Sequence, residues 1–275
     1  SKESSILVSA GSPRDGYSIE GGATPAIMLW DVAKKKKLAT FGSIGGRVIS
    51  LAVSPKGKII ATGILSYDFV GDPFRVELWD TKSQKKTMTL PSKNSASSLA
   101  FSPDGTMLAT TGCNLGRCAN VKLWNVADGK QIAILKGHTD IVNTVSFSPD
   151  GKLLATCSCE DETIKLWNTH TYKAEAILKR QDGIAPRTIA FVPNGKILAS
   201  GHEGGIVTLW DVTTRKRITD FKANSYSVWC LAFSPDGKTL ASSAATRKGI
   251  IKLWDIASFV ETLGSKKAPV KTAGE

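Results

Sequence analysis

Histidine and cysteine are the residue types in this sequence that most often carry chemistry. The 275-residue chain contains three histidines, His138, His170 and His202, and five cysteines. No histidine stands in a His-Glu-x-x-His motif, and the chain has no phosphate-binding glycine loop and no nucleophile elbow. We expect His170 and His202 to lie in solvated turns. The sequence therefore predicts no catalytic residue, no metal site and no cofactor.

Four of the cysteines lie close to two equivalent turns. Cys113 and Cys118 flank one turn, and Cys159 occupies the position of Cys113 one repeat later, with Cys157 two residues before it. Thiolates on adjacent units could bind zinc or form a disulfide, but the spacing matches no established zinc pattern. We favour unpaired, reduced, mostly buried thiols, and we expect Cys230 in the core. An odd number of cysteines in a chain that is not cysteine-dense favours a reducing compartment, and a cytoplasmic location is expected.

The elements that must position these residues repeat along the whole chain. Six similar strings, from Ile-Met-Leu-Trp-Asp-Val to Ile-Lys-Leu-Trp-Asp-Ile, place tryptophans at regular intervals, and most are preceded by a string of the type Phe-Ser-Pro-Asp-Gly. The tryptophans are Trp30, Trp79, Trp124, Trp167, Trp210 and Trp254. Such a period indicates one supersecondary unit per repeat.

Each unit is predicted to contain four strands, here called a to d. In residues 141–178, an alternating β-branched segment forms strand a, and Ser-Pro-Asp-Gly suits a type I turn before strand b. The tryptophan string forms strand c, and strand d follows at the outer edge. A single four-stranded sheet cannot bury both of its faces, so the units must stack, and a ring protects most of their edges. No segment has a long helical period.

The tryptophan strings and the period of the repeat resemble those of the WD-repeat family, and the resemblance covers essentially the whole chain. It implies an all-β fold, a β-propeller of six four-stranded antiparallel blades, as a single domain over residues 1–275. It also implies a structural hydrogen-bond chain in the repeat that carries the Gly-His dipeptide. The candidate members of that chain are His138, either Thr156 or Ser158, Asp161 and Trp167.

The two ends of the chain are in phase with the repeat. Residues 270–275 stand where strand a stands in other units, and the N-terminus aligns with the turn that leads into strand b. The tail, residues 264–275, is therefore expected to supply the inner strand of the first blade and to close the ring. The alternative is that the chain is a fragment of a seven-bladed propeller.

Strand alternation divides the loops between two sides of the disc. The a–b and c–d turns share one side, which is basic, in a chain whose net charge is +12. Its cations are Lys34, Lys35, Lys36, Lys37, Lys58, Lys82, Lys85, Lys86, Lys152, Lys196, Arg215, Lys216, Arg217 and Lys238. Lysines in tight turns usually only solubilise and protect edges. A surface that binds nucleic acid or an anionic membrane is the alternative, and its binding would weaken steeply with salt.

The opposite side carries the b–c loops, which are long in the first two repeats, over residues 11–26 and 64–74. Aromatic and arginine side chains anchor protein interfaces, so we expect these loops to bind a partner. The predicted partner-binding residues are Arg14, Tyr17, Tyr67, Phe69, Phe74 and Arg75.

The function predicted from the sequence is that of a non-catalytic protein–protein interaction scaffold. The scaffold role is implied by the resemblance, while the partner stays unidentified and a monomer is expected. An accessory domain of a larger enzyme is a further alternative. No apolar run approaches the roughly 18 residues that cross a membrane as a helix.

Overall fold

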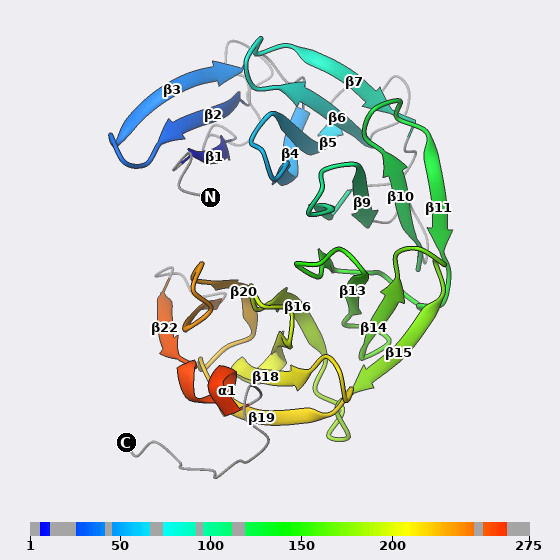
Figure 1. Ribbon diagram of the computed structural model, residues 1–275, viewed down its shortest axis with the longest axis vertical. Helices are drawn as coiled ribbons and strands as arrows, with labels where there is room; N and C mark the ends of the chain where they lie inside the picture. Colours follow the sequence, from blue (N-terminus) through cyan, green and yellow to red (C-terminus); the bar gives the residue numbers. More distant parts are fainter. Residues whose placement is uncertain are drawn as a thin grey trace.

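Six antiparallel β-sheets stand around a common axis, like the blades of a propeller (Figure 1). The computed structural model describes residues 6–11, 26–41, 46–66, 74–91, 96–111, 119–244 and 250–262. The predicted six-bladed propeller is confirmed. Within the described residues, four blades have four strands, and the first and last have three.

Blades 1 to 3 follow one another in chain order. Their strands are β1 (Ile6–Gly11), β2 (Ala26–Asp31) and β3 (Lys36–Phe41); β4 (Gly46–Val53), β5 (Ile59–Ser66), β6 (Phe74–Asp80) and β7 (Lys86–Leu90); and β8 (Ser98–Phe101), β9 (Met107–Thr111), β10 (Val121–Asn125) and β11 (Gln131–Leu135).

Blades 4 to 6 continue the ring. Their elements are β12 (Thr144–Phe147), β13 (Leu153–Ser158), β14 (Thr163–Asn168) and β15 (Ala174–Lys179); β16 (Pro186–Phe191), β17 (Ile197–His202), the 3-10 turn η1 (Glu203–Gly205), β18 (Ile206–Asp211) and β19 (Arg217–Lys222); and β20 (Val228–Phe233), β21 (Thr239–Ala244), β22 (Ile251–Asp255) and the helix α1 (Ala257–Thr262).

The Ser-Pro-Asp-Gly turns are built by their own side chains. In blade 4, Ser148 Oγ accepts a hydrogen bond from the amide of Leu153 at 2.9 Å and donates one to Asp150 at 2.6 Å. Gly151 closes the turn with a φ of 73°, a conformation that glycine adopts without steric cost. The turn therefore sets the register between strands a and b from local sequence alone.

Successive blades pack face to face through apolar side chains. Val207 and Leu209 of β18 are fully buried, in a cluster that includes Leu231 and Leu240 of the next blade. Equivalent clusters join the earlier blades, so the core is a series of inter-blade layers. The alternation in strand c places its apolar residues toward the next blade and its tryptophan toward the preceding one.

The outer strand predicted for the last blade is wrong, because residues 257–262 form α1 instead. Asp255 caps the turn, accepting a hydrogen bond from the amide of Ala257 at 2.9 Å. Phe259 and Val260 then pack against the apolar cluster between blades 5 and 6. A helical turn buries both adjacent side chains on that cluster, whereas a strand would point one of them away from it.

An opening separates the first blade from the last (Figure 1). Inner strands of neighbouring blades contact one another in the order β1–β4–β8–β12–β16–β20, and within the described residues no contact of similar extent joins β20 to β1. The predicted closing segment, residues 264–275, lies outside the described residues. The first blade therefore has an inner edge, β1, at which a further strand can pair.

Deletion of residues 270–275 is expected to lower the melting temperature by several degrees. A strand paired with β1 would add ladder hydrogen bonds and cover apolar surface, a contribution of about 2 kcal/mol, and about 2–4 °C accompanies each kcal/mol in a domain of this size. Differential scanning fluorimetry of the truncated and intact chains measures the shift. Equal melting temperatures would show that these residues do not form a closing strand.

Candidate interaction surface and buried polar networks

A continuous chain of hydrogen bonds runs through blade 4. Trp167 Nε1 donates to Thr156 Oγ1 at 2.8 Å, and that hydroxyl lies 2.7 Å from His138 Nε2. His138 Nδ1 lies 2.7 Å from the carboxylate of Asp161. Of the two hydroxyls that the resemblance offered, the structure places Thr156 against the histidine, while Ser158 accepts a bond from the amide of Asp161 at 3.3 Å. This hydrogen-bond network links strands b and c to the loop that enters the blade.

Burial determines the charge states of the residues in this hydrogen-bond network. It lowers the pKa of His138 below the usual value, and the neighbouring Asp161 offsets this only in part. Burial alone would raise the pKa of Asp161, but hydrogen bonds from Thr163 and His138 lower it overall. A neutral His138 then donates from Nδ1 to the carboxylate and accepts from Thr156 at Nε2. Every polar atom of the ring is satisfied, as a structural role requires.

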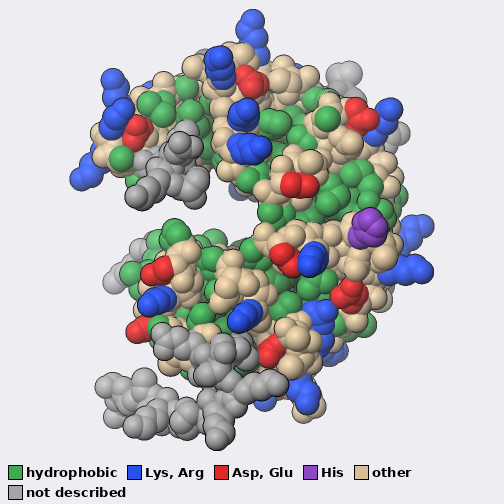
Figure 2. Space-filling model, in the orientation of Figure 1, with side chains coloured by type: hydrophobic (Ala, Val, Ile, Leu, Met, Phe, Trp, Pro, Cys, Tyr) green, Lys and Arg blue, Asp and Glu red, His purple; other side chains and the backbone are tan. Residues whose placement is uncertain are grey.

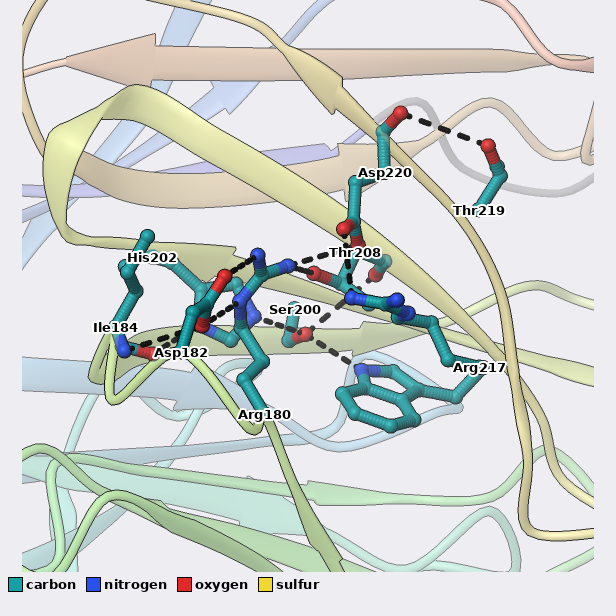
Figure 3. A network of polar contacts seen from close by, with 10 residues as sticks. Arg180, Asp182, Ile184, Ser200, His202, Thr208, Arg217, Thr219 and Asp220 are labelled. Carbon is teal, nitrogen blue, oxygen red and sulfur yellow. Dashed lines mark hydrogen bonds and ion pairs between the residues drawn. The ribbon is translucent and has the colours of Figure 1, made fainter.

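Blade 5 builds a similar chain from a different histidine (Figure 3). Trp210 Nε1 donates to Ser200 Oγ, and Ser200 Oγ lies near His202 Nε2, each at 2.7 Å. His202 Nδ1 lies 3.0 Å from the carbonyl oxygen of Ile184. The expectation that His202 is solvated is wrong, since it is 1% exposed. Strand β17 extends through His202, and residues two apart in a strand share a face, which places it beside Ser200.

Arg180 supports the same blade from the loop that enters it (Figure 3). The side chain of Arg180 is 4% exposed, and its guanidinium donates hydrogen bonds to Asp182 and, at 2.6 Å, to Thr208 Oγ1. It also forms an ion pair with Asp220 at 2.8 Å. The carboxylate of Asp220 also forms an ion pair with the guanidinium of Arg217 at 3.0 Å. A buried guanidinium with carboxylates on two sides is a paired charge, so it holds the loop and the outer strand together.

The other four tryptophans find the same kind of partner. Each indole N–H donates to a hydroxyl of strand b: Trp30 to Ser9, Trp79 to Thr62, Trp124 to Thr110 and Trp254 to Ser242. In blade 6, Asn224 occupies the repeat position of His138 and donates to Ser242 at 3.4 Å. Asn224 was not predicted from the sequence, since the family's dipeptide has a histidine at this position.

The described cysteines do not form a metal site. Burial raises the pKa of Cys157 to about 12, so this thiol stays protonated, and Cys159 is half-buried with a raised pKa from the same cause. Among the described residues there is no group of three potential ligands, while Cys113 and Cys118 lie outside them. The expectation that Cys230 is in the core is wrong, because it is exposed. A β-bulge lies between Val228 and Cys230, but Thr188 is buried after the equivalent bulge of blade 5. Cys230 is exposed because, among the described residues, no following blade covers this face of β20.

The same bulge presents an aromatic surface that was not predicted from the sequence. Trp229 is 55% exposed, and Tyr226 in the preceding loop is 61% exposed. Arg187 stands at the equivalent bulge of blade 5, with its guanidinium carbon 5.1 Å from the centre of the Trp229 ring. Glu203 holds that guanidinium through hydrogen bonds of 2.6 and 3.1 Å. We call Arg187, Glu203, Tyr226 and Trp229 the aromatic surface.

The long loops of blades 1 and 2 are described only at their bases. Arg14, Tyr17, Tyr67 and Phe69 lie outside the described residues. Phe74 and Arg75 begin β6, where Phe74 pairs with Leu65 of β5 and both residues are half-buried. Arg75 bonds the buried Glu77 at 3.0 Å. The paired strands β5 and β6 of blade 2 therefore extend on this side of the disc as far as the start of the long loop.

The basic side of the disc carries charges of both signs. Figure 2 shows one face, on which Lys and Arg lie mainly around the outer rim with Asp and Glu among them. Several cations of the c–d turns are paired: Lys34 with Asp31, Lys86 with Glu77, Arg215 with Glu175 and Arg217 with Asp220. This mixing weakens the field that a polyanion would meet.

Comparisons with known proteins agree with this architecture. The WD domain, G-beta repeat model matches residues 84–125, 129–168 and 215–255, and the model of the anaphase-promoting complex subunit 4 WD40 domain matches residues 172–234. Within the described residues, no helix is long and apolar enough to cross a membrane.

Relatives with different names share this similarity. Autophagy-related protein 16 of Arabidopsis thaliana is 27% identical over 63% of this chain and 33% of its own length. Periodic tryptophan protein 2 homolog of Dictyostelium discoideum is 28% identical over 74% of this chain and 23% of its own. Pre-mRNA-processing factor 19 of Oryza sativa is 28% identical over 76% of this chain and 38% of its own. The chain thus spans at most about two fifths of these relatives. With its tryptophan-to-hydroxyl bonds in all six blades, the chain belongs to the WD-repeat family of β-propellers.

Proposed function

We propose that this protein is a non-catalytic protein–protein interaction scaffold whose partner contacts the side of the disc that carries the b–c loops. The observation that carries the proposal is the aromatic surface, where an exposed tryptophan is held in place by a fixed arginine. The two buried histidines occupy hydrogen-bond networks inside blades, so they are not free to exchange protons with a substrate.

The chemistry of the aromatic surface suits a protein partner. Tryptophan, tyrosine and arginine are the residue types that dominate binding energy at protein interfaces, and Trp229 and Tyr226 expose large rings at a modest cost in side-chain entropy. Glu203 and Trp229 fix the guanidinium of Arg187, so the surface is ordered before a partner arrives. Pre-organisation of this kind reduces the entropic cost of association.

We propose that the loops of blades 1 and 2 add a second contact region on the same side, through Tyr67, Phe69 and their neighbours. A partner that touches both regions would extend from blades 5 and 6 to blades 1 and 2 on this side of the disc. We further propose a cytoplasmic, monomeric protein, in line with the unpaired and protonated thiol of Cys157.

Two double variants test this proposal, Trp229→Ala with Tyr226→Ala and Tyr67→Ala with Phe69→Ala. Each is expected to weaken binding of the natural partner about thirtyfold, which corresponds to roughly 2 kcal/mol for a true anchor pair, with little change in melting temperature. The partner is first identified by affinity capture and mass spectrometry, and its dissociation constant is then measured by calorimetry.

The matched control is Ile177→Ala, which truncates an exposed apolar residue on the outer strand of blade 4. It should leave the dissociation constant unchanged. If both double variants bind as tightly as the control, the partner does not use this side of the disc. If a double variant unfolds, its aromatic residues pack the rim of the blades instead.

A further inference from the structure

The last blade presents an apolar face that every other blade has buried. Ile251 and Leu253 of β22 are 68% and 71% exposed. The residues at the same two positions of strand c elsewhere are at most 7% exposed: Ile27 and Leu29, Val76 and Leu78, Val121 and Leu123, Ile164 and Leu166, and Val207 and Leu209. In those five blades the next blade covers the pair, so the sixth pair lacks its usual cover.

The inner strand of the last blade, β20, also differs from other inner strands in its contact with a following blade. In blade 4, Thr144 Oγ1 donates to the carbonyl of Arg187 in the next blade at 3.0 Å, and in blade 2 Ser50 Oγ donates to the carbonyl of Ala96. Cys230 occupies the equivalent ladder position in β20 and is exposed. A surface built to contact a following blade therefore faces outward.

The first blade exposes the complementary half of this contact. Leu7 of β1 is 55% exposed, whereas the residues that pair with the tryptophan in the other five blades are fully buried: Ile60, Leu108, Leu154, Leu198 and Leu240. Figure 2 shows the opening between the two blades, with hydrophobic side chains at the edge of the last blade. The opening is therefore bordered by the exposed Ile251 and Leu253 on the last blade and by the exposed Leu7 on the first blade.

We propose that this opening is a docking site for a blade-like β-sheet supplied by a partner chain, which completes the ring by packing on both walls. This site is separate from the aromatic surface and goes beyond the scaffold function proposed for it. The five inter-blade contacts already present define the chemistry of the occupant. It is an antiparallel sheet with apolar side chains on both faces, one face meeting Ile251 and Leu253 and the other meeting Leu7.

The geometry favours such an occupant over the alternatives that residues 1–275 and a second copy of them offer. The close-packed layers between blades fix the angle from each blade to the next, and drawing blade 1 onto blade 6 would disturb all five layers. An intact second copy offers only one apolar face at each end, because its second blade covers the other face of its first. A strand added to β1 by residues 270–275 would complete blade 1 without covering Leu253.

The first experiment asks whether the face is free in the isolated protein. Leu253→Ala and Leu209→Ala change the same residue type at the same repeat position, one exposed and one buried. We expect Leu209→Ala to lower the melting temperature by about 5 °C or more and Leu253→Ala by less than about 1 °C. Light scattering after size exclusion should report a monomer.

The second experiment supplies the occupant by joining a second copy of residues 186–222, the four strands of blade 5, to the end of the full chain through a flexible linker. We expect this added blade to raise the melting temperature by several degrees and to slow hydrogen exchange in β22. The double variant Ile251→Asp with Leu253→Asp should remove both effects, while Ile132→Asp with Ile134→Asp, on the exposed outer strand of blade 3, should not.

Three results would overturn the proposal. If Leu253→Ala lowers the melting temperature as much as Leu209→Ala does, the chain already covers this face. The tail is then the cover if deletion of residues 264–275 abolishes the effect of Leu253→Ala, and the first blade is the cover if the effect persists. A dimer dissociated by the Ile251→Asp and Leu253→Asp pair would assign the face to a second copy. An added blade that leaves the melting temperature and the hydrogen exchange of β22 unchanged, or that acts equally in the double variant, would show that the opening accepts no added sheet.

Discussion

The free energy of unfolding is expected to fall by about 3 kcal/mol between pH 7 and pH 4 through His202 alone. Burial lowers the pKa of His202 from 6.5 to about 4 in the folded protein, while the unfolded chain keeps the higher value. The unfolded state therefore binds more protons across this range, and stability is lost as the pH falls through it. Each unit of difference contributes roughly 1.4 kcal/mol.

Neighbouring groups sharpen the pH range of this effect. His138 also has a lowered pKa, so it destabilises the fold in the same direction on acidification. The hydrogen bond from Arg180 lowers the pKa of Asp182 to about 2, and the stability contributed by Asp182 is lost only as the pH falls below about 4. Loss of stability between pH 6.5 and pH 4 is therefore dominated by the two buried histidines.

Urea unfolding of the His202→Gln variant at pH 7, 5.5 and 4 measures the contribution. The variant is expected to be less stable at pH 7, because Ser200 and Ile184 lose their partner, but its stability should change less with pH by about 3 kcal/mol. His170→Gln, at an exposed turn, is the matched control and should retain the full pH dependence. An unchanged pH profile in His202→Gln would contradict the neutral, buried histidine.

The His138→Ala variant is expected to lose about 3 kcal/mol of stability, or roughly 6–12 °C in melting temperature. The substitution removes a buried ring that fills space beside Trp167 and takes one hydrogen-bond donor from the carboxylate of Asp161. Thr156 also loses the acceptor for its hydroxyl hydrogen. Thermal unfolding followed by circular dichroism measures the change.

Two further variants test the structural role of this hydrogen-bond network. Asp161→Asn retains the shape and one acceptor, so it should cost less than His138→Ala, about 1 kcal/mol. His170→Ala should have no effect. A His138→Ala protein as stable as the parent would show that the network does not hold blade 4 together, and the proposal of a structural histidine would fail.

The sequence alone determined the repeat and therefore the fold class. The signals that it carries are local: the turn serine that bonds five residues ahead, the glycine that closes the turn, and the alternation that sends the tryptophan of strand c to one face. Local signals of this kind predict strands and turns correctly when the same solution recurs six times. The members of the blade 4 hydrogen-bond network were implied by the resemblance to the WD-repeat family, which left Thr156 and Ser158 as alternatives.

Tertiary structure decided the positions at which one blade departs from the repeat. His202 was predicted to lie in solvent, because its turn has no sequence mark to show that strand β17 continues far enough to bury it beside Ser200. Residues 257–262 became a helix because Phe259 and Val260 find an apolar cluster that chain segments distant in sequence assemble. Trp229 is exposed because a bulge, set by pairing with β21, turns it off the core, whereas Cys230 is exposed because no following blade covers its face of β20 among the described residues.

The surfaces of the protein also depend on the assembled ring. Trp229 and Arg187 are distant in the chain and meet only because neighbouring blades bring their inner strands together. Ile251 and Leu253 have the same sequence pattern as their buried counterparts, so composition and periodicity predict burial for all six pairs. Whether such a face is covered depends on whether another blade stands beside it, and this is a property of the ring rather than of the strand.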